Sequence, residues 1–275
     1  MQSISDIFHT FNRQLTQLSS ERLYSGLSND NFLVRATQHN QQSAYLLKRY
    51  REHWPTLGLA AQTKFAQQQL CPKPLWLDKA NKLAIFEYID GVTAQGSYTA
   101  ELINKLVSLH SHNVVSDAMD IQQELQHYHA CELYQHYQPA VNAALTELEK
   151  LPRDAGFCHN DLVKENIIEN SNGMFLIDFE YANNNDVYFD LAALVVSCEL
   201  DTQGKQQLLL SYQQQLPASR NFYCSVAKLE YYQLLFLVLC ICWYRARSIT
   251  EKVAPLCLQL DALIAQQHNN AIDDK

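Results

Sequence analysis

The sequence predicts an α+β protein with a strand-rich first part and a mainly helical second part. Up to about residue 90, apolar residues occur mostly in short runs of strand length, and from residue 91 onward they recur at helical spacing. Hydrophobic residues make up 47% of the 275 residues and charged residues 18%, which is enough apolar material for a sizeable core. We therefore predict two domains, 1–90 and 91–275.

The first part is expected to contain two helices and four strands. Apolar side chains recur at i, i+3 and i+4 over residues 3–18, which predicts an amphipathic opening helix. Short apolar runs around polar turns indicate strands, and Pro72 and Pro74 end the second helix. The expected elements are helices at 3–18 and 57–70 and strands at 31–37, 43–50, 75–77 and 83–89.

The second part is expected to be helical, apart from one hairpin. An Asn-Gly pair between apolar runs is the strongest short-range hairpin signal, and Ser171-Asn172-Gly173 therefore predicts a hairpin between strands at 166–169 and 174–178. A slightly longer loop than a strict two-residue turn at Asn172-Gly173, or a bulge, is expected, because the strict turn would place Asn166 opposite Phe179. Proline interrupts helices, so a break is expected near Pro139. The expected helices are 98–112, 121–149, 203–216, 221–247 and 250–268.

Charge and composition exclude several classes of protein. Twenty-one basic and 29 acidic residues give a net charge of -8, so no basic field is available for nucleic acid. The eight cysteines form no Cys-x-x-Cys pair and are expected to be reduced core thiols. The start of the chain lacks a signal-peptide pattern, and the longest apolar run, 234–244, is shorter than the roughly 20 residues of a membrane helix. We expect a cytoplasmic protein without membrane contact, of undetermined oligomeric state.

One stretch carries the residues of a chemical site. Asp161 and Asn166 stand five residues apart, and Asp178 follows on the returning strand of the predicted hairpin. Phosphoryl transfer uses such a set: Asp161 would accept the proton of an attacking hydroxyl, while Asn166 and Asp178 would bind Mg²⁺. We expect His159 and Asp190 to brace this loop, Asp190 through backbone N–H groups.

These motifs resemble a known superfamily. The pattern His159-x-Asp161-x-x-x-x-Asn166 followed by Asp178-Phe179-Glu180 is similar to the catalytic and metal motifs of the aminoglycoside phosphotransferase and choline kinase superfamily. The resemblance implies a bilobal protein-kinase-like fold, with a small strand-rich N-lobe and a large mainly helical C-lobe. It also implies an ATP- and Mg²⁺-dependent kinase that phosphorylates a small-molecule alcohol. A protein kinase fits less well, because Glu180 replaces the glycine of Asp-Phe-Gly.

The same resemblance implies a set of nucleotide-binding residues. The segment from Gly26 to Leu33 is similar to the short phosphate loop of choline- and thiamine-kinase-like enzymes, and Lys48 occupies the position of their basic strand residue. The adenine would bond to the backbone of the hinge. The residues implied for ATP are Ser28, Asn29, Asn31, Lys48, Glu87 and Ile89.

One feature departs from the superfamily pattern. Kinase-fold enzymes usually pair the strand lysine with a helix glutamate, yet the predicted helix 57–70 contains no acid. Either Glu52 or a polar stand-in such as Gln62 is expected to orient Lys48, or the small lobe closes differently. The missing glutamate also supports an alternative, a nucleotide-binding pseudokinase that acts as a binding module.

The acceptor is expected to be a cation. The net charge is negative, and aromatic faces attract cations. Choline, ethanolamine and thiamine are the leading acceptors, with an aminoglycoside or a homoserine-type alcohol as alternatives. The residues proposed for acceptor binding are Glu180, Tyr181, Trp243 and Tyr244.

Overall fold

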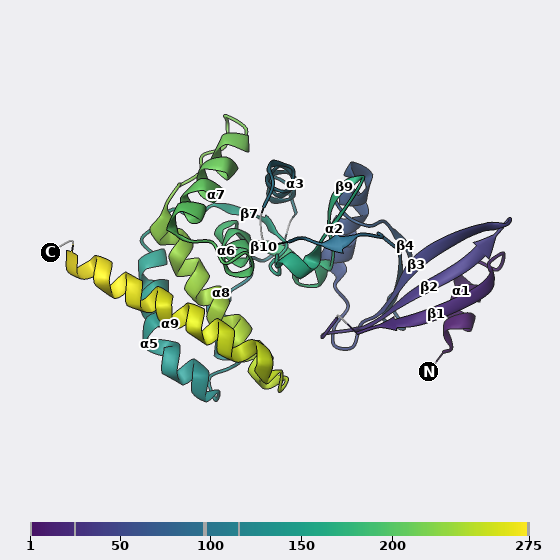
Figure 1. The fold of residues 1–275 in the computed structure, drawn as a ribbon, viewed down its shortest axis with the longest axis horizontal. Coiled ribbons are helices and arrows are strands. Elements are labelled where there is room, and N and C mark those ends of the chain that lie inside the picture. The colour runs from purple at the N-terminus through teal and green to yellow at the C-terminus, as the bar shows by residue number, and fades with distance from the viewer. Residues whose placement is uncertain (1, 25, 96–97, 115, 274–275) are drawn as a thin grey trace. The chain divides into compact units, whose positions relative to one another are not determined.

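The computed structural model describes residues 2–24, 26–95, 98–114 and 116–273, and the chain forms two compact units (Figure 1). The first unit contains the chain up to Thr93 together with Ile167–Tyr181. The second contains Ala94–Asn166 and the chain from Ala182 onward. The division therefore separates Asn166 from Asp178, two residues of the predicted site.

The first unit is built on a five-stranded antiparallel sheet. Its strand order is β1-β2-β3-β5-β4, and helix α1 contributes Ile7 and Phe8 to a core with Val34, Leu47 and Ile85 of the sheet. These elements are α1 (Ile4–Phe11), β1 (Thr16–Leu23), β2 (Asp30–Gln38), β3 (Gln41–Arg49), β4 (Pro74–Asp78) and β5 (Leu83–Glu87).

The prediction of one helix over 3–18 is wrong beyond Phe11. Ser3 and Asp6 form a capping box at the start of α1, while Asn12 has extended backbone and its side chain accepts the Gln14 N–H at 3.0 Å. This local bond ends the helix. The chain then enters β1, a strand with few apolar residues that pairs with β2.

A second helix and a small sheet complete the first unit. Helix α2 (Thr56–Phe65) continues into a 3-10 turn, η1 (Ala66–Gln68), and a three-stranded sheet has the order β6-β8-β9. A Cβ on Gly58 of α2 would lie 1.9 Å from the Phe179 carbonyl oxygen, so only glycine permits this close approach. The strands of the small sheet are β6 (Val92–Thr93), β8 (Ile167–Asn170) and β9 (Gly173–Leu176).

The predicted hairpin of β8 and β9 exists, and its turn lies within the predicted segment Ser171-Asn172-Gly173. Asn170 pairs with Gly173, so Ser171-Asn172 forms the turn. Gly173 is the first residue of β9 and has φ 115°, a left-handed conformation that glycine adopts without steric cost. Phe179–Tyr181 (η3) follows this hairpin and belongs to the same unit.

The second unit is mainly helical, with one small two-stranded sheet. Strands β7 (Ala155–Cys158) and β10 (Asn183–Asp186) pair antiparallel, and the 3-10 turn η2 (Lys164–Asn166) ends the segment that follows β7. The helices are α3 (Ala100–His110), α4 (Ile121–Gln126), α5 (Glu132–Leu148), α6 (Tyr188–Ser197), α7 (Thr202–Gln215), α8 (Val226–Ala246) and α9 (Thr250–Asp273).

Two helix predictions in this unit are wrong. The break expected near Pro139 lies instead at 127–131, and Pro139 is inside α5, where buried Tyr137 and Val141 hold the helix in place by packing. Helix α6 was not predicted. Its residues from Tyr188 to Val196 are all buried, so it has no polar face to reveal a helical period.

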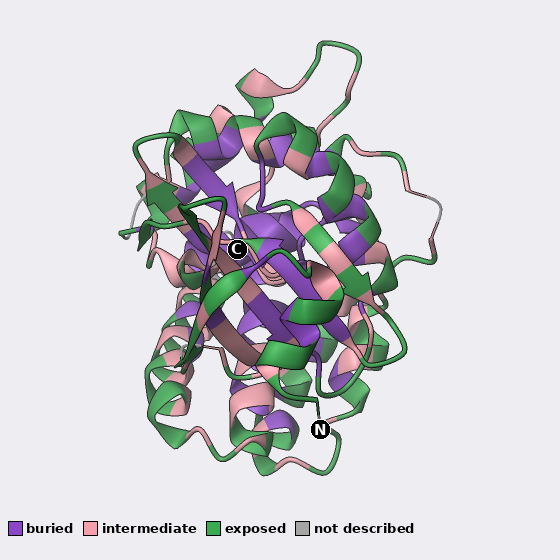
Figure 2. Ribbon diagram, turned by 90° about the vertical axis from the view of Figure 1, so that its right-hand side faces the viewer, coloured by how far each residue is buried: buried purple, intermediate pink, exposed green. Residues whose placement is uncertain are grey.

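Helix α8 is the central helix of the second unit and packs against α5, α6 and α9. Among the helices of the described residues, it alone is long and apolar enough to cross a membrane, and 61% of its most apolar window is buried inside the fold. Such burial is typical of a core helix. Figure 2 shows the buried residues on the inward sides of strands and helices and the exposed residues on the outer helices.

Candidate functional site

The first unit brings a buried lysine and two carboxylates together. Lys48 of β3 is 4% exposed, and its Nζ lies 2.5 Å from Asp178 Oδ1 and 3.9 Å from Glu180 Oε2. Asp178 has φ 65°, a left-handed conformation that aspartate adopts more readily than most residues. Burial raises the pKa of the Glu180 carboxyl, and the Lys48 charge opposes that rise. The three groups form one ionic cluster of buried Lys48 and Glu180 with partly exposed Asp178, which we call the lysine cluster.

The bend between β1 and β2 is tied to the lysine cluster. Asn29 is buried, and its Nδ2 donates to Glu180 Oε2 at 2.5 Å. Ser28 lies half-buried in the same bend. A Cβ on Gly26 would meet Asn31 Nδ2 at 2.3 Å, so a larger residue there would displace the Asn31 side-chain amide. The structure therefore brings together the three residues predicted for the phosphate loop, and it shows that the Asn29 side chain is engaged by Glu180.

Helix α2 does not supply the partner of Lys48. The Gln62 amide donates to the Pro72 carbonyl at 3.1 Å, and the ion pairs of Lys48 are made with the two acids that follow β9. The expected replacement partners, Glu52 and Gln62, are therefore not those that hold the lysine. Because Lys48 is held by other acids, the absence of a helix glutamate no longer favours a pseudokinase.

The two predicted hinge residues lie at and just after the end of β5. The Glu87 N–H donates to the Lys73 carbonyl at 2.9 Å, so this group is engaged within the sheet region. Ile89 is half-buried two residues further on. The Glu87 N–H is therefore not available to a nucleotide base.

Asp161 and Asn166 are joined by hydrogen bonds within the second unit. Asn166 Nδ2 donates to both the carbonyl oxygen and Oδ2 of Asp161, each at 2.9 Å, and the Val163 N–H donates to the same carbonyl. Asn160, immediately before Asp161, has φ 62°. Left-handed backbone at an asparagine is tolerated, and such conformations cluster at functional sites. The Asp161 carboxylate is thereby oriented by Asn166, whose amide oxygen is left for another ligand.

Asp190 of α6 holds the backbone just before Asp161. Its Oδ2 accepts the His159 N–H at 2.7 Å and its Oδ1 accepts the Asn160 N–H at 2.8 Å, which confirms the expected role of Asp190. His110 Nε2 lies 3.0 Å from Asp190 Oδ2, and His110 Nδ1 lies 2.7 Å from the Tyr212 hydroxyl. His110 therefore links Asp190 to Tyr212 through its two ring nitrogens. The sequence did not reveal the Tyr212 contact, which spans 102 positions.

His110, Cys158 and Asp190 also have the spacing of metal ligands, with ligand atoms within 4.8 Å of one another. The His110 and Asp190 atoms already form hydrogen bonds, however. Burial raises the pKa of the Cys158 thiol, and the nearby Asp190 and Asp186 charges raise it further, whereas metals bind thiolates. This group therefore serves to support the Asp161 loop.

Tyr244 is the predicted acceptor residue that the structure places near Asp161 within the second unit. Burial raises the pKa of its hydroxyl, and the nearby Cys240 and Asp161 groups raise it further. The hydroxyl therefore remains protonated. Tyr244 lies near the end of α8, so this central helix positions an aromatic side chain within electrostatic range of Asp161.

The other predicted acceptor residues have different surroundings. The Arg247 guanidinium lies 3.9 Å from the centroid of the Trp243 ring and covers one of its faces. Tyr181 belongs to the first unit, with its ring centroid 6.2 Å from that of His53. Glu180 belongs to the lysine cluster. Trp243 lies beside Tyr244 on α8, with ring centroids 5.2 Å apart and an interplanar angle of 89°. The structure therefore groups the two aromatic residues of the second unit, while Glu180 and Tyr181 belong to the first unit.

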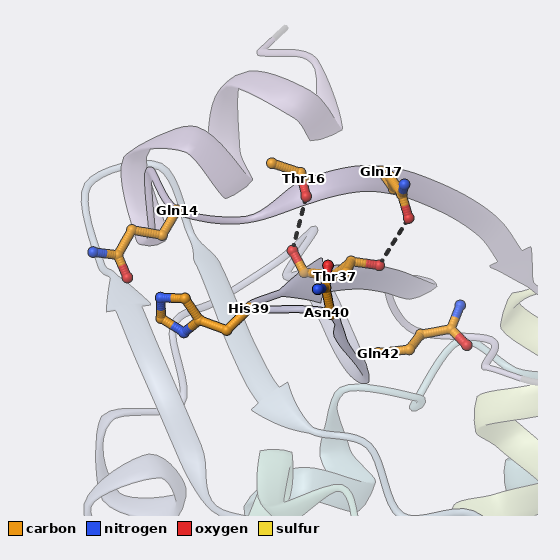
Figure 3. A pocket seen from close by; sticks show the side chains of 7 residues that line it. All are labelled: Gln14, Thr16, Gln17, Thr37, His39, Asn40 and Gln42. Atoms are coloured by element: carbon orange, nitrogen blue, oxygen red, sulfur yellow. Dashed lines mark hydrogen bonds between the residues drawn. The ribbon is translucent and has the colours of Figure 1, made fainter.

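A polar groove of about 500 Å³ lies elsewhere in the first unit (Figure 3). Thr16 donates to the Thr37 carbonyl at 3.1 Å, and Thr37 donates to the Gln17 amide oxygen at 3.1 Å. Thr37 and Lys48 lie toward opposite ends of the β2–β3 ladder, since Thr37 pairs with Gln42 and Lys48 pairs with Asn31. This groove is therefore separate from the lysine cluster.

The whole of this arrangement agrees with one family of enzymes. The profile of the phosphotransferase enzyme family matches residues 20–223, and the chain belongs to that family. The match includes the lysine cluster, the Asp161 loop and Asp190. The predicted superfamily is thus confirmed.

Protein LicA and solved structures of choline kinases are among the similar chains. Protein LicA of Haemophilus influenzae is 34% identical over 74 residues, which is 26% of this chain and 22% of that relative's length. The crystal structure of choline kinase LicA from Streptococcus pneumoniae has a TM-score of 0.76 at 22% identity and covers 96% of this chain and 98% of the other. A structure of LicA in complex with AMP has a TM-score of 0.68 at 21% identity, covering 95% and 100%. These likenesses confirm the predicted fold class, an antiparallel-sheet N-terminal region followed by a helical C-terminal region.

Proposed function

We propose that this chain transfers the γ-phosphate of ATP to the hydroxyl of a small cationic alcohol, with choline as the preferred acceptor. The observation that carries the proposal is the hydrogen-bonded pair of Asp161 and Asn166 on a loop whose backbone is held by Asp190. In a member of the phosphotransferase family, this pair supplies an oriented carboxylate beside a metal-ligand amide.

The residues present fit a magnesium ion. Mg²⁺ binds oxygen ligands. Asn166 uses its Nδ2 for Asp161, which leaves its Oδ1 as the ligand atom, and Asp178 uses Oδ1 for Lys48, which leaves Oδ2. Asn166 and Asp178 are the residues that would hold the ion. When bound, Mg²⁺ neutralises the developing charge on the transferred phosphoryl group.

The nucleotide is assigned to the first part of the chain, about residues 1–90, and the acceptor to residues 91–275. Lys48 supplies a buried positive charge for phosphate oxygens, and the bend with Ser28 and Asn31 supplies polar groups. Asn29 and Glu180 act as positioning residues, because their side chains bind each other. The similarity to LicA in complex with AMP supports a nucleotide at this fold.

Asp161 is the proposed proton acceptor. Its carboxylate would accept the proton of the acceptor hydroxyl as the oxygen attacks phosphorus, and the Asn166 amide keeps it oriented. Tyr244 would offer an aromatic face to the cationic group of the acceptor. The net charge of -8 favours a cation over an anionic acceptor. We also propose that the protein acts in the cytoplasm. Its use of ATP and its eight cysteines without disulfides are consistent with that compartment.

The experiment that tests the proposal is an ATP turnover assay with Mg²⁺ and one acceptor at a time. Choline, ethanolamine, thiamine, kanamycin and homoserine are compared by kcat/KM, with a neutral alcohol of choline's size as the control. We expect choline to exceed the neutral alcohol at least about tenfold, a difference of about 1.4 kcal/mol, which lies within the roughly 0.5–2 kcal/mol that a good cation–π contact contributes. A preference for homoserine or the neutral alcohol would contradict a cationic acceptor. If none of these acceptors is phosphorylated, the result would contradict a kinase function toward them.

A further inference from the structure

An arginine of this chain covers one of the two aromatic rings at the end of α8. The Trp243 and Tyr244 side chains are half-buried, so part of each ring reaches solvent. Arg247 Cζ lies 3.9 Å from the centroid of the Trp243 ring. A cation within about 6 Å of the face of a tryptophan ring is attracted to it, and tryptophan attracts cations more strongly than tyrosine does. The protein therefore holds a cation of its own on the better of the two rings.

The backbone at the end of α8 fixes the position of Arg247. Arg247 is the C-cap of the helix, and the Ile249 N–H donates to the Tyr244 carbonyl at 3.0 Å. Ser248, between them, has φ 59°. This bond and the left-handed residue after the cap are those of a Schellman motif, in which glycine is more usual than serine. Because Arg247 follows Trp243 by four positions, the two side chains share one face of the helix.

The covered ring adjoins the residue assigned to the acceptor. The Trp243 and Tyr244 ring centroids are 5.2 Å apart, and the two rings are nearly perpendicular, at 89°. Tyr244 lies within electrostatic range of Asp161, the proposed proton acceptor, and all three residues belong to the second unit. A cation that binds Tyr244 would therefore lie beside Trp243, on which the Arg247 charge is already placed.

We propose that Arg247 determines acceptor specificity by competing with the cationic group of the acceptor for the face of Trp243. This role rests on the proposed function, because it concerns the same acceptor site. The guanidinium leaves the ring when the acceptor binds, and the cationic group of the acceptor takes its place. A neutral alcohol makes no cation–π contact, so Arg247 does not compete with it. Arg247 thereby sets how strongly the site prefers a cation over a neutral alcohol.

Arg247→Gln removes the competing charge and keeps a polar side chain. We expect KM for choline to fall about two- to fivefold, the factor that corresponds to a cation–π contact at an exposed site. KM for ATP and KM for a neutral alcohol of choline's size should stay unchanged. The matched control is Arg245→Gln, which removes the same charge from the same helix turn. Arg245 is exposed and lines a different surface, a cavity that it shares with Val253 and Ala254 of α9, so this control should keep the wild-type KM for choline.

A double-mutant cycle tests whether the effect depends on the ring. In Trp243→Leu the guanidinium has no ring to occupy, so adding Arg247→Gln should give no further fall in KM for choline. Two results would overturn the proposal: a fall in KM that Arg245→Gln reproduces, or a fall that persists in the Trp243→Leu background. Either would show that Arg247 acts through net charge and not through Trp243.

A binding measurement that needs no turnover completes the test. Trp54 and Trp76, the other two tryptophans of the chain, are replaced by phenylalanine, so that fluorescence reports on Trp243 alone. Tetramethylammonium chloride is then titrated at constant ionic strength. We expect a saturable change in fluorescence, with a Kd about two- to fivefold lower in Arg247→Gln than in the protein that keeps Arg247. Equal Kd values, or no saturable change in either protein, would overturn the competition. Absence of choline turnover would instead contradict the proposed function, whatever the fluorescence shows.

Discussion

Replacing Gly58 by alanine tests the backbone contact between α2 and the segment after β9. The new Cβ would lie 1.9 Å from the Phe179 carbonyl oxygen and 2.9 Å from its carbon, whereas ordinary contact begins at 3.4 Å. Overpacking of this kind costs about 1–3 kcal/mol, and the obstacle here is backbone, which favours the upper end. Alanine regains about 0.5–1 kcal/mol through helix propensity. We therefore expect Gly58→Ala to lower the free energy of unfolding by about 2 kcal/mol.

The assay is urea unfolding followed by circular dichroism, with Gly204→Ala as the matched control. Gly204 is also helical, but its added Cβ would lie 3.1 Å from Leu200 Cβ and 3.3 Å from an Asp201 oxygen, so small side-chain adjustments accommodate it. This control should be neutral or slightly more stable. Phe179 separates Asp178 from Glu180, so Gly58→Ala should also weaken ATP binding. A Gly58→Ala protein that unfolds at the wild-type urea concentration would refute the reasoning.

Three further predictions concern the lysine cluster, the metal ligands and the acceptor. Asp178→Ala should reduce Mg²⁺-dependent binding of an ATP analogue more than Asn166→Ala does, because a carboxylate brings charge to the ion. Equal, small losses of binding in a Mg²⁺ titration of both variants would contradict the metal assignment. Burial raises the pKa of Glu180, so the wild type loses stability as the pH rises through that pKa. Glu180→Gln should therefore be more stable than the wild type at pH 7. A difference in urea midpoint between the two proteins that does not close at acid pH would contradict this. Tyr244→Ala should raise KM for choline and leave KM for ATP unchanged in steady-state assays, whereas equal changes in both would argue against acceptor contact.

Local signals in the sequence indicate the candidate site residues, whereas the partners of those residues depend on tertiary packing. The spacing of Asp161, Asn166 and Asp178 and the hairpin between them could be recognised, because turn chemistry and metal-ligand types are local signals. The partner of Lys48 could not, because it lies 130 positions away and depends on tertiary packing. The Tyr212 contact with His110 was missed for the same reason.

The fold shows a similar limit. Strand β1 was missed because its residues are mostly polar, and its position depends on backbone pairing with β2. Helix α6 was missed because burial on all sides removes the polar face on which periodicity depends. Strands β2, β3 and β5 and helices α7 to α9 have clearer patterns, and the structure places them close to the predicted ranges.

The most direct test of the proposed function is the turnover of Asp161→Asn with ATP, Mg²⁺ and choline, measured beside binding of an ATP analogue. Asparagine keeps the size of the side chain and removes its ability to accept a proton. We predict a loss in kcat of about 10²–10⁴-fold with nucleotide affinity nearly unchanged, since general bases contribute about this much. Wild-type turnover in Asp161→Asn, with nucleotide still bound, would contradict the assignment of Asp161 as the base.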